Sequence, residues 1–312
     1  MSSKWVRGLS LLNVIANVII VVTGGAVRLT GSGLGCPTWP NCAAGTFHAT
    51  AEMGIHGAIE WGNRLLSVAV GIIAVATLLA AIAYKPRRTS LIWLTGAVTG
   101  AVVLQGGIGA FTVNTGLAPW LVSIHFLVSM GILAFAYTAW RRANEPDGTI
   151  HTRALPTAVR VLWWLVAGAA TASLIVGTLV TGAGPHAGDP NAPRLALDPA
   201  VISQVHADVV FALIGLSLGL ALCLHALRAH RSVVTAAWVL LAVELGQGAI
   251  GMVQYFTGLP ELLVGAHLAG ACLLWLAVLS VGLRLDTTHT ASTEAEPDAE
   301  VTGAKEHAVI AP

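Results

Sequence analysis

The sequence has 312 residues, of which 55% are hydrophobic and only 10% are charged, and its formal net charge is +1. A soluble globular chain carries about a quarter charged residues, so this composition excludes an ordinary soluble protein. A nearly neutral charge balance gives no support for nucleic-acid binding.

Apolar runs of roughly twenty residues, the length that crosses the hydrocarbon core of a bilayer, recur along the chain. Because a helix satisfies its own peptide groups in lipid, these runs predict transmembrane helices. The first run has no convincing small-residue cleavage site, so we interpret it as a retained helix rather than a signal peptide. The expected fold class is an all-α integral membrane protein with eight spans, at residues 9–28, 61–83, 91–113, 119–140, 161–181, 203–226, 234–256 and 262–283.

Basic residues gather at alternate ends of these spans. Thirteen of the sixteen lie at the ends on one side of the membrane, and only Arg28, Arg64 and Arg194 lie at the ends on the other side. The positive-inside rule then predicts that both termini are cytoplasmic and that the connections after the odd-numbered spans face outward. The other thirteen of the sixteen basic residues are Lys4, Arg7, Lys85, Arg87, Arg88, Arg141, Arg142, Arg153, Arg160, Arg228, Arg231, Arg284 and Lys305.

Two parts of the chain match without a gap at an offset of 142 residues. The matching segments are Gln105-Gly106-Gly107-Ile108-Gly109 with Gln247-Gly248-Ala249-Ile250-Gly251, Thr115-Gly116-Leu117 with Thr257-Gly258-Leu259, and His125 with His267. An even number of spans separates the equivalents, so the halves share one orientation and form a parallel repeat. We expect two pseudo-twofold-related four-helix bundles, residues 1–143 and 161–285, joined by a cytoplasmic linker at 144–160 and followed by a disordered tail at 286–312.

Four of the eleven histidines, His56, His125, His206 and His267, lie at or near the outer ends of even-numbered spans. Ionisable residues inside spans are costly and are therefore candidates for function. A single one is more often a satisfied polar contact, but repeated placement in both halves favours metal ligation. His206 and His267 suit bis-histidine ligation of haem, whereas zinc would need a third or fourth ligand nearby.

The first half is less regular, because the counterpart of His206 is Asn63, a poor iron ligand. His56, Glu60 and Asn63 share one helical face at the spacing i, i+4, i+7. His56 lies about 10 Å from Asn63 along a helix axis. It can replace the missing ligand only if a haem sits nearer the outer surface or the start of the helix is irregular. The second axial ligand opposite His125 therefore stays open.

Glu60 is the most informative single residue, since it is a carboxylate at the outer end of an apolar helix, one turn from His56. An ion pair with Arg64, at i+4, is one interpretation. A surface ion pair contributes little, so we give more weight to a proton-handling or substrate-orienting role.

Cys36 and Cys42 lie in the first outward connection. The outer side of a bacterial cytoplasmic membrane is oxidising, so we predict that they form a disulfide. A static brace and a redox-active pair are equally compatible with the sequence.

These features resemble the haem A synthases over the membrane-embedded residues up to about 283. The motifs that carry the resemblance are Gly24-Gly25-Ala26-Val27-Arg28-Leu29-Thr30-Gly31-Ser32-Gly33, the Cys36 and Cys42 pair, Glu60-Trp61-Gly62-Asn63-Arg64 and Thr181-Gly182-Ala183-Gly184-Pro185-His186. His125, His206 and His267 fall at the expected places.

The resemblance implies an oxidoreductase of the bacterial cytoplasmic membrane that oxidises the C8 methyl of haem O to a formyl group by successive hydroxylations. The product, haem A, serves terminal oxidases. The resemblance further implies a haem b cofactor held by His206 and His267, a substrate haem bound by His125, and Glu60 as the catalytic residue. A haem O synthase and a haem–copper oxidase are the implied partners.

The departure from the family is Asn63, where many members have histidine, and His56 is the candidate substitute. We also expect Arg28 and Arg64 to pair with haem propionates near the outer interface. The principal alternative is a di-haem b electron-transfer protein that oxidises quinol, which explains the histidines but neither Glu60 nor the Asn63 asymmetry. A transporter would fit the repeat alone and would carry no haem.

Overall fold

Eight long helices dominate the chain, which a computed structural model describes over residues 3–43, 45–153 and 155–290. The described helices are α1 (Ser3–Leu29), α2 (Gly54–Ala83), α3 (Thr89–Asn114), α4 (Pro119–Ala143), α5 (Thr157–Ala183), α6 (Pro199–Ala226), α7 (Arg231–Phe256) and α8 (Glu261–Gly282). Each is continuous, and is long and apolar enough to cross a bilayer. The eight predicted spans are confirmed, and the protein is an all-α integral membrane protein. Most helices begin earlier than predicted, because the polar or small residues of their first turns carry no apolar signal.

Proline and a capping aspartate mark where the helices that carry His125 and His206 begin. Pro119 and Pro199 occupy the first turns of α4 and α6, where the missing backbone N–H has no intrahelical partner to lose. The carboxylate of Asp198 accepts hydrogen bonds from the backbone N–H groups of Ala200 and Val201, at 2.8 and 3.1 Å. These signals set the level at which both helices start, and with it the depth of their histidines.

The turns after α3 and α7 have the same backbone conformation. Gly116 and Leu117 have φ values of 63° and 64°, and Gly258 and Leu259 have φ values of 80° and 61°. In both turns the leucine N–H donates at 2.8 Å to the carbonyl five residues earlier in the chain. The 142-residue sequence repeat therefore has a structural counterpart at this pair of turns.

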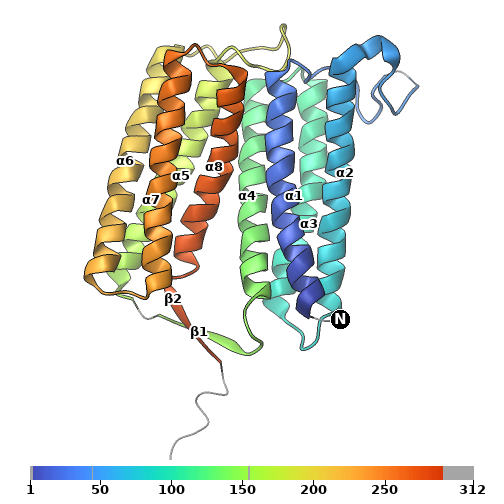
Figure 1. The fold of residues 1–312 in the computed structure, drawn as a ribbon. Helices are drawn as coiled ribbons and strands as arrows, with labels where there is room; N and C mark the ends of the chain where they lie inside the picture. The colour runs from blue at the N-terminus through green and yellow to red at the C-terminus, as the bar shows by residue number, and fades with distance from the viewer. Residues whose placement is uncertain (1–2, 44, 154, 291–312) are drawn as a thin grey trace, which may run out of the picture.

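The helices form two groups of four (Figure 1). In the first group α1 and α3 each pack against α2 and α4, and in the second group α5 and α7 each pack against α6 and α8. Helices α2 and α4 are therefore diagonal to each other, as are α6 and α8. The two groups meet along α1, α4, α5 and α8. There the indole N–H of Trp275 on α8 donates to the carbonyl of Met130 on α4 at 2.9 Å.

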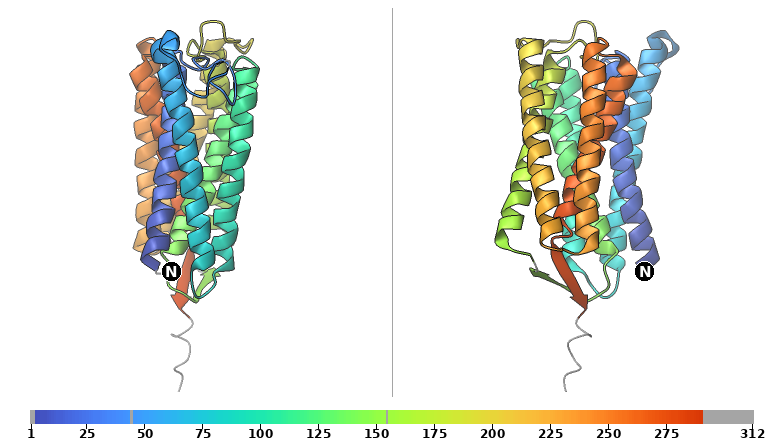
Figure 2. Two further views of the ribbon diagram at one scale, coloured as in Figure 1. Left: turned by 90° about the vertical axis from the view of Figure 1, so that its right-hand side faces the viewer. Right: turned by 60° about the vertical axis from the view of Figure 1, so that its left-hand side comes forward.

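The connections after α1 and α5 meet at the end of the bundle opposite Ser3, which we call the outer end (Figure 2). The backbone N–H of Gly33 donates to the carbonyl of Gly188 at 2.8 Å. Leu117 lies so close that a Cβ on Gly33 would overlap it, and Gly188 has a φ of +96°. Glycine at both positions therefore allows the two connections to touch. This contact joins the first half to the second half at the outer end.

The opposite, inner end carries a small antiparallel ribbon of β1 (Thr149–Arg153) and β2 (Asp286–Thr290), at the same end of the bundle as the start of α1 (Figure 1). Arg160 donates to Asp286 at 2.7 Å. The expected disordered tail is therefore wrong for residues 286–290. Pairing with the linker satisfies the backbone of this polar segment, and the segment's own sequence does not reveal that partner. Residues 291–312 lie outside the described residues.

Gly25 and Gly24 offer a matched test of how closely the halves approach. A side chain on Gly25 would overlap Leu268 of α8, whereas nothing lies within 4 Å of the corresponding position on Gly24. We expect Gly25→Leu to lower the free energy of unfolding by about 1–3 kcal/mol through overpacking. Gly24→Leu should change it by less than about 0.5 kcal/mol. Thermal unfolding of the purified protein in detergent measures both, and an equal loss in the two variants would contradict a packed interface at Gly25.

Candidate functional site

The two histidines of the second half come from diagonal helices, His206 from α6 and His267 from α8, both near the outer end. The Cε1 atom of His206 lies 3.2 Å from the place of a Cβ on Gly177, and that of His267 lies 3.3 Å from the place of a Cβ on Gly251. Both Nδ1 atoms are buried and have no hydrogen-bond partner among the described residues. The glycines therefore let each ring lie against a neighbouring helix, and the rings keep unused ligating capacity.

The first half repeats this arrangement on α4 but not on α2. The ring of His125 lies 3.6 Å from the place of a Cβ on Gly109, and its Nδ1 is also buried without a partner in the described chain. Gln105 donates to the backbone carbonyl of His125 at 2.7 Å. Helix α2 instead carries Asn63, whose side-chain oxygen accepts a hydrogen bond from Thr23 at 2.8 Å. The two halves thus offer three imidazoles and one amide.

An open cavity of about 250 Å³ lies beside Asn63, and its lining comes from α1 and α2 alone. Its walls are mostly apolar, which suits the edge of a flat apolar ligand better than a bare ion. The lining residues are Thr23, Ala26, Val27, Ile59, Gly62, Asn63 and Leu66.

His56 lies in the first turn of α2, which is helical from Gly54 onward. Its side chain is exposed at the outer end, and its Nδ1 forms a hydrogen bond with the hydroxyl of Ser32 at 2.9 Å. The irregular helix start that would have brought His56 towards Asn63 is therefore wrong, because a regular helix keeps them about 10 Å apart along its axis. His56 as a substitute ligand stays a prediction, and it requires a haem bound nearer the outer surface.

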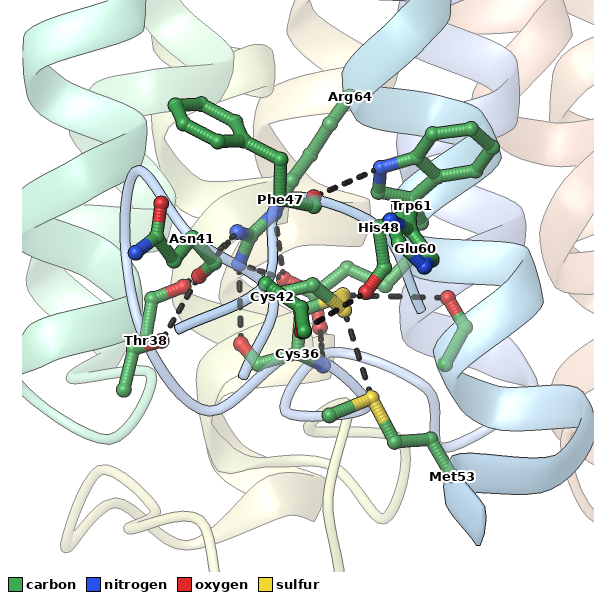
Figure 3. The surroundings of a disulfide bond; sticks show 12 residues. Cys36, Thr38, Asn41, Cys42, Phe47, His48, Met53, Glu60, Trp61 and Arg64 are labelled. Atoms are coloured by element: carbon green, nitrogen blue, oxygen red, sulfur yellow. Dashed lines mark hydrogen bonds and ion pairs between the residues drawn. A yellow bond between two sulfur atoms is a disulfide. The ribbon is translucent and has the colours of Figure 1, made fainter. Parts of the chain in front are cut away.

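Glu60 joins α2 to the disulfide loop, residues Cys36–Cys42 (Figure 3). The predicted bond between Cys36 and Cys42 is present. Glu60 is only 5% exposed, and its Oε2 accepts a hydrogen bond from the backbone N–H of Cys36 at 2.6 Å. Its Oε1 pairs with Arg64 at 2.5 Å. This ion pair is buried, so the weakness of surface pairs does not count against it, and the catalytic role of Glu60 stays a prediction.

All five N–H groups of Arg64 are used in this cluster. Nε and Nη2 donate to Glu60 at 3.1 and 2.5 Å, and Nη2 also donates to the carbonyl of Cys36 at 2.9 Å. Nη1 donates to the carbonyls of Thr38 and Asn41, at 2.8 and 3.4 Å. A guanidinium has five donors, so none remains for another anion. The predicted contact of Arg64 with a haem propionate therefore requires the disulfide loop to release it first.

Arg28 at the outer end of α1 keeps unused donor capacity. Its Nη2 donates to the carbonyl of Thr181 at 2.6 Å, whereas its Nε is buried with no partner among the described residues. Arg194 lies near enough for the two positive charges to interact. Neither arginine pairs with a carboxylate in the part of the chain that the structure describes. Two neighbouring cations without a counter-ion favour an anionic group here, which is the chemistry of the propionate contact predicted for Arg28.

The family described as cytochrome oxidase assembly protein (COX15-CtaA) matches residues 7–188. The match covers more than half of the 312 residues, including α1 from its second turn onward, α2–α5 and the connections that carry the motifs. The chain belongs to this family. The resemblance to the haem A synthases that the motifs predicted is thereby confirmed.

The chain is also similar to several bacterial proteins named heme A synthase. Over 134 residues it is 33% identical to that of Symbiobacterium thermophilum, covering 43% of each chain. Over 133 residues it is 30% identical to that of Bacillus licheniformis, covering 41% of this chain and 42% of the relative. Over 219 residues it is 25% identical to that of Hyphomonas neptunium, covering 58% and 62%. The chain thus spans less than two thirds of each relative, and these bacterial relatives with the eight helices identify a multi-pass protein of the bacterial cytoplasmic membrane.

One buried ionisable group, Glu244, was not singled out from the sequence. Glu244 on α7 is 1% exposed and accepts a hydrogen bond from Ser217 on α6 at 2.7 Å. The sequence could have indicated it, because Glu244 is the one acidic residue in the predicted span 234–256 and ionisable residues inside spans are costly.

Arg64 allows a direct test of how the disulfide loop of this family member is held. Arg64→Lys keeps the charge but has three donors instead of five, so some of the loop contacts are lost. Each such contact with a charged donor stabilises by roughly 1.5–3 kcal/mol, so we expect the loop to open at least about ten-fold more often. The sulfurs of Cys36 and Cys42 are fully buried, and their reduction by a mild thiol should accelerate accordingly. Alkylation followed by mass spectrometry measures the rate.

The matched control for this measurement is Arg194→Lys. Arg194 bonds only carbonyls of its own connection, at 3.1 Å to Ala192 and 2.6 Å to Pro185. Its substitution should leave the reduction rate unchanged. If Arg64→Lys also leaves the rate unchanged, the loop is held closed by something other than Arg64.

Proposed function

We propose that this protein is a haem A synthase, an oxidoreductase that converts the C8 methyl of haem O into a formyl group. The observation that carries the proposal is the unequal pair of sites. The second half has two buried imidazoles on diagonal helices, and the first half has one imidazole diagonal to the amide of Asn63. A bis-histidine site suits electron transfer, whereas a site with one strong ligand leaves one face of a haem open for reaction. The relatives named heme A synthase support the same activity.

We infer that the second half holds a haem b cofactor. Buried polar atoms almost always have partners, so the unpaired Nδ1 atoms of His206 and His267 favour a ligand supplied from outside the chain. Among the described residues no group of three or more His, Cys, Asp and Glu side chains could hold a metal ion. This donor set therefore fits an iron already held by a porphyrin. His206 and His267 would be its axial ligands, and haem b would there supply single-electron transfer.

The first half is the proposed binding site for the substrate, haem O. His125 would ligate the substrate iron, and the apolar cavity beside Asn63 would receive part of the ring. His56 remains the proposed second ligand for a more outward binding position. Arg28, together with Arg194, would bind the propionates, because their donors lie at the outer end without a carboxylate partner in the described chain.

Glu60 is the proposed catalytic residue. It lies one turn from Asn63 on the same face of α2, and so on the outer side of the proposed substrate site. Two successive hydroxylations, each of which gives two electrons to an external acceptor and takes one oxygen atom from an external source, convert the methyl carbon into a geminal diol, which loses water to form the formyl group. We propose that the carboxylate of Glu60 accepts and returns the protons of these steps. Its contacts with Arg64 and the N–H of Cys36 hold it in one position, as proton transfer to a bound substrate requires.

The proposed partners follow from the chemistry of substrate and product. Haem O would come from a haem O synthase in the same membrane, and haem A would pass to a haem–copper oxidase.

The large exposed apolar side chains along the helices, such as Phe111 and Phe256, face lipid in this setting.

The decisive test is chromatography of haems extracted from membranes in which this chain is produced together with a haem O synthase. We expect haem A to appear, with the hydroxylated intermediate. Only haem B and haem O in the presence of folded, haem-loaded protein would instead identify a di-haem electron-transfer protein. The absence of any haem from the purified protein would contradict both functions.

Glu60→Gln tests the proposed catalytic role in the same system. The amide keeps the shape of the side chain but cannot take a proton, so we expect haem A formation to fall by about 10²–10⁴-fold. The haem b content should stay normal, because His206 and His267 are untouched. His267→Ala is the control, which should lose both haem b and product. Full product formation by Glu60→Gln with normal haem content would exclude the proton-handling role.

A further inference from the structure

Glu244 lies about midway along α7, outside the site described above. Ser217 of α6 donates to its Oε1 at 2.7 Å, but its Oε2 is buried and has no hydrogen-bond partner among the described residues. Polar contacts between helices can serve as structural glue, and the Ser217 contact alone would fit that role. The second carboxylate oxygen is not explained by it.

Buried leucines lie one turn from Glu244 on α7 and one turn from Ser217 on α6. Leu213, Leu220 and Leu240 belong to the same buried cluster of the second half. Helix α7 packs against α6 and α8, and Glu244 forms no ion pair with any described residue. A carboxyl group in such a place is neutral unless a positive charge lies within reach. Between their first and last turns, the titratable residues of α6 and α8 are His206, Asp208, Cys223, His267 and Cys272.

Glu244 shares a helical face with the histidine site. Glu244, Gln247 and Gly251 are spaced i, i+3, i+7 on α7, and Gly251 is the residue against which the ring of His267 packs. Seven residues of helix separate Glu244 from that contact by about 10 Å along the axis. Charges at this separation still interact in an interior that screens them less than water does. The equivalent position of the first half, 142 residues earlier, carries Val102 instead of a carboxylate.

We propose that Glu244 is a proton acceptor coupled to electron transfer at the site of His206 and His267. When a one-electron donor reduces that site, the positive charge there falls by one. One proton from water then forms an O–H bond on the carboxylate of Glu244, so that electron and proton enter together and the net charge of the interior is unchanged. Departure of the electron releases the proton again. This inference rests on the proposed haem b site, and it gives the second half a role in moving protons as well as electrons.

The test uses purified protein loaded with haem b, in a His125→Ala background so that only the second-half site is populated. The midpoint potential is measured across pH by spectroelectrochemistry, with and without Glu244→Gln, which can still accept the hydrogen bond of Ser217. We expect the potential of the parent protein to fall as pH rises, and this dependence to flatten in Glu244→Gln. Infrared difference spectra should show a carboxyl C=O band that appears on reduction, shifts in heavy water and is missing from Glu244→Gln.

Two controls separate this role from a structural one. Glu261→Gln removes an exposed carboxylate at the outer end of α8, and it should keep both signals. Ser217→Ala removes the interhelical hydrogen bond but keeps the carboxyl group, so it should lower stability and still show the infrared band. Unchanged pH dependence and an unchanged carboxyl band in Glu244→Gln with normal haem content would overturn the proposal and leave the proposed function intact. A chain that retains no haem at His206 and His267 would overturn both.

Discussion

The bilayer interior offers no water to an imidazole or a carboxylate, so every such group in this bundle needs a partner from the protein or from a ligand. Glu60 meets this requirement within the chain, through Arg64 and the backbone N–H of Cys36. His206 and His267 do not, because their Nδ1 atoms are buried without a partner among the described residues. Glu60 is thus held in place by the protein itself, whereas the two imidazoles favour a partner supplied from outside the chain.

The outer end is assembled as one connected unit. The disulfide loop is joined through Arg64 to Glu60, and Glu60 lies on the same face of α2 as Asn63. The close approach of Gly33 and Gly188 extends this unit to the second half. Because the carboxylate and the loop share one arginine, opening the loop would change both the position and the electrostatic environment of Glu60. The chemistry of the cysteine pair and that of the proposed substrate site are thus physically linked.

The repeat supplies one scaffold for two different sites. The equivalent turns after α3 and α7 have the same conformation, and His125 and His267 both pack against an equivalent glycine. Against this common background the halves differ in a few polar residues. Asn63 stands where the second half has His206, and Val102 stands where it has Glu244. We propose that these differences make one site reactive and the other suited to moving electrons and protons, since the identity of the ligand and the nearby charge control a haem's behaviour.

The sequence by itself determined the eight spans, the repeat, the depth of the histidines and the disulfide, because these follow from apolar length, register and residue type, which are local properties. Only the tertiary structure decided which partners the polar groups have. Arg64 donates to the carbonyls of Thr38 and Asn41, and His56 is held by Ser32, through contacts across 23 to 26 residues. Residues 286–290 form a strand because the linker lies beside them, and Glu244 meets Ser217 on another helix. Such contacts depend on how segments distant in the chain approach one another, and no local pattern of residues encodes that approach.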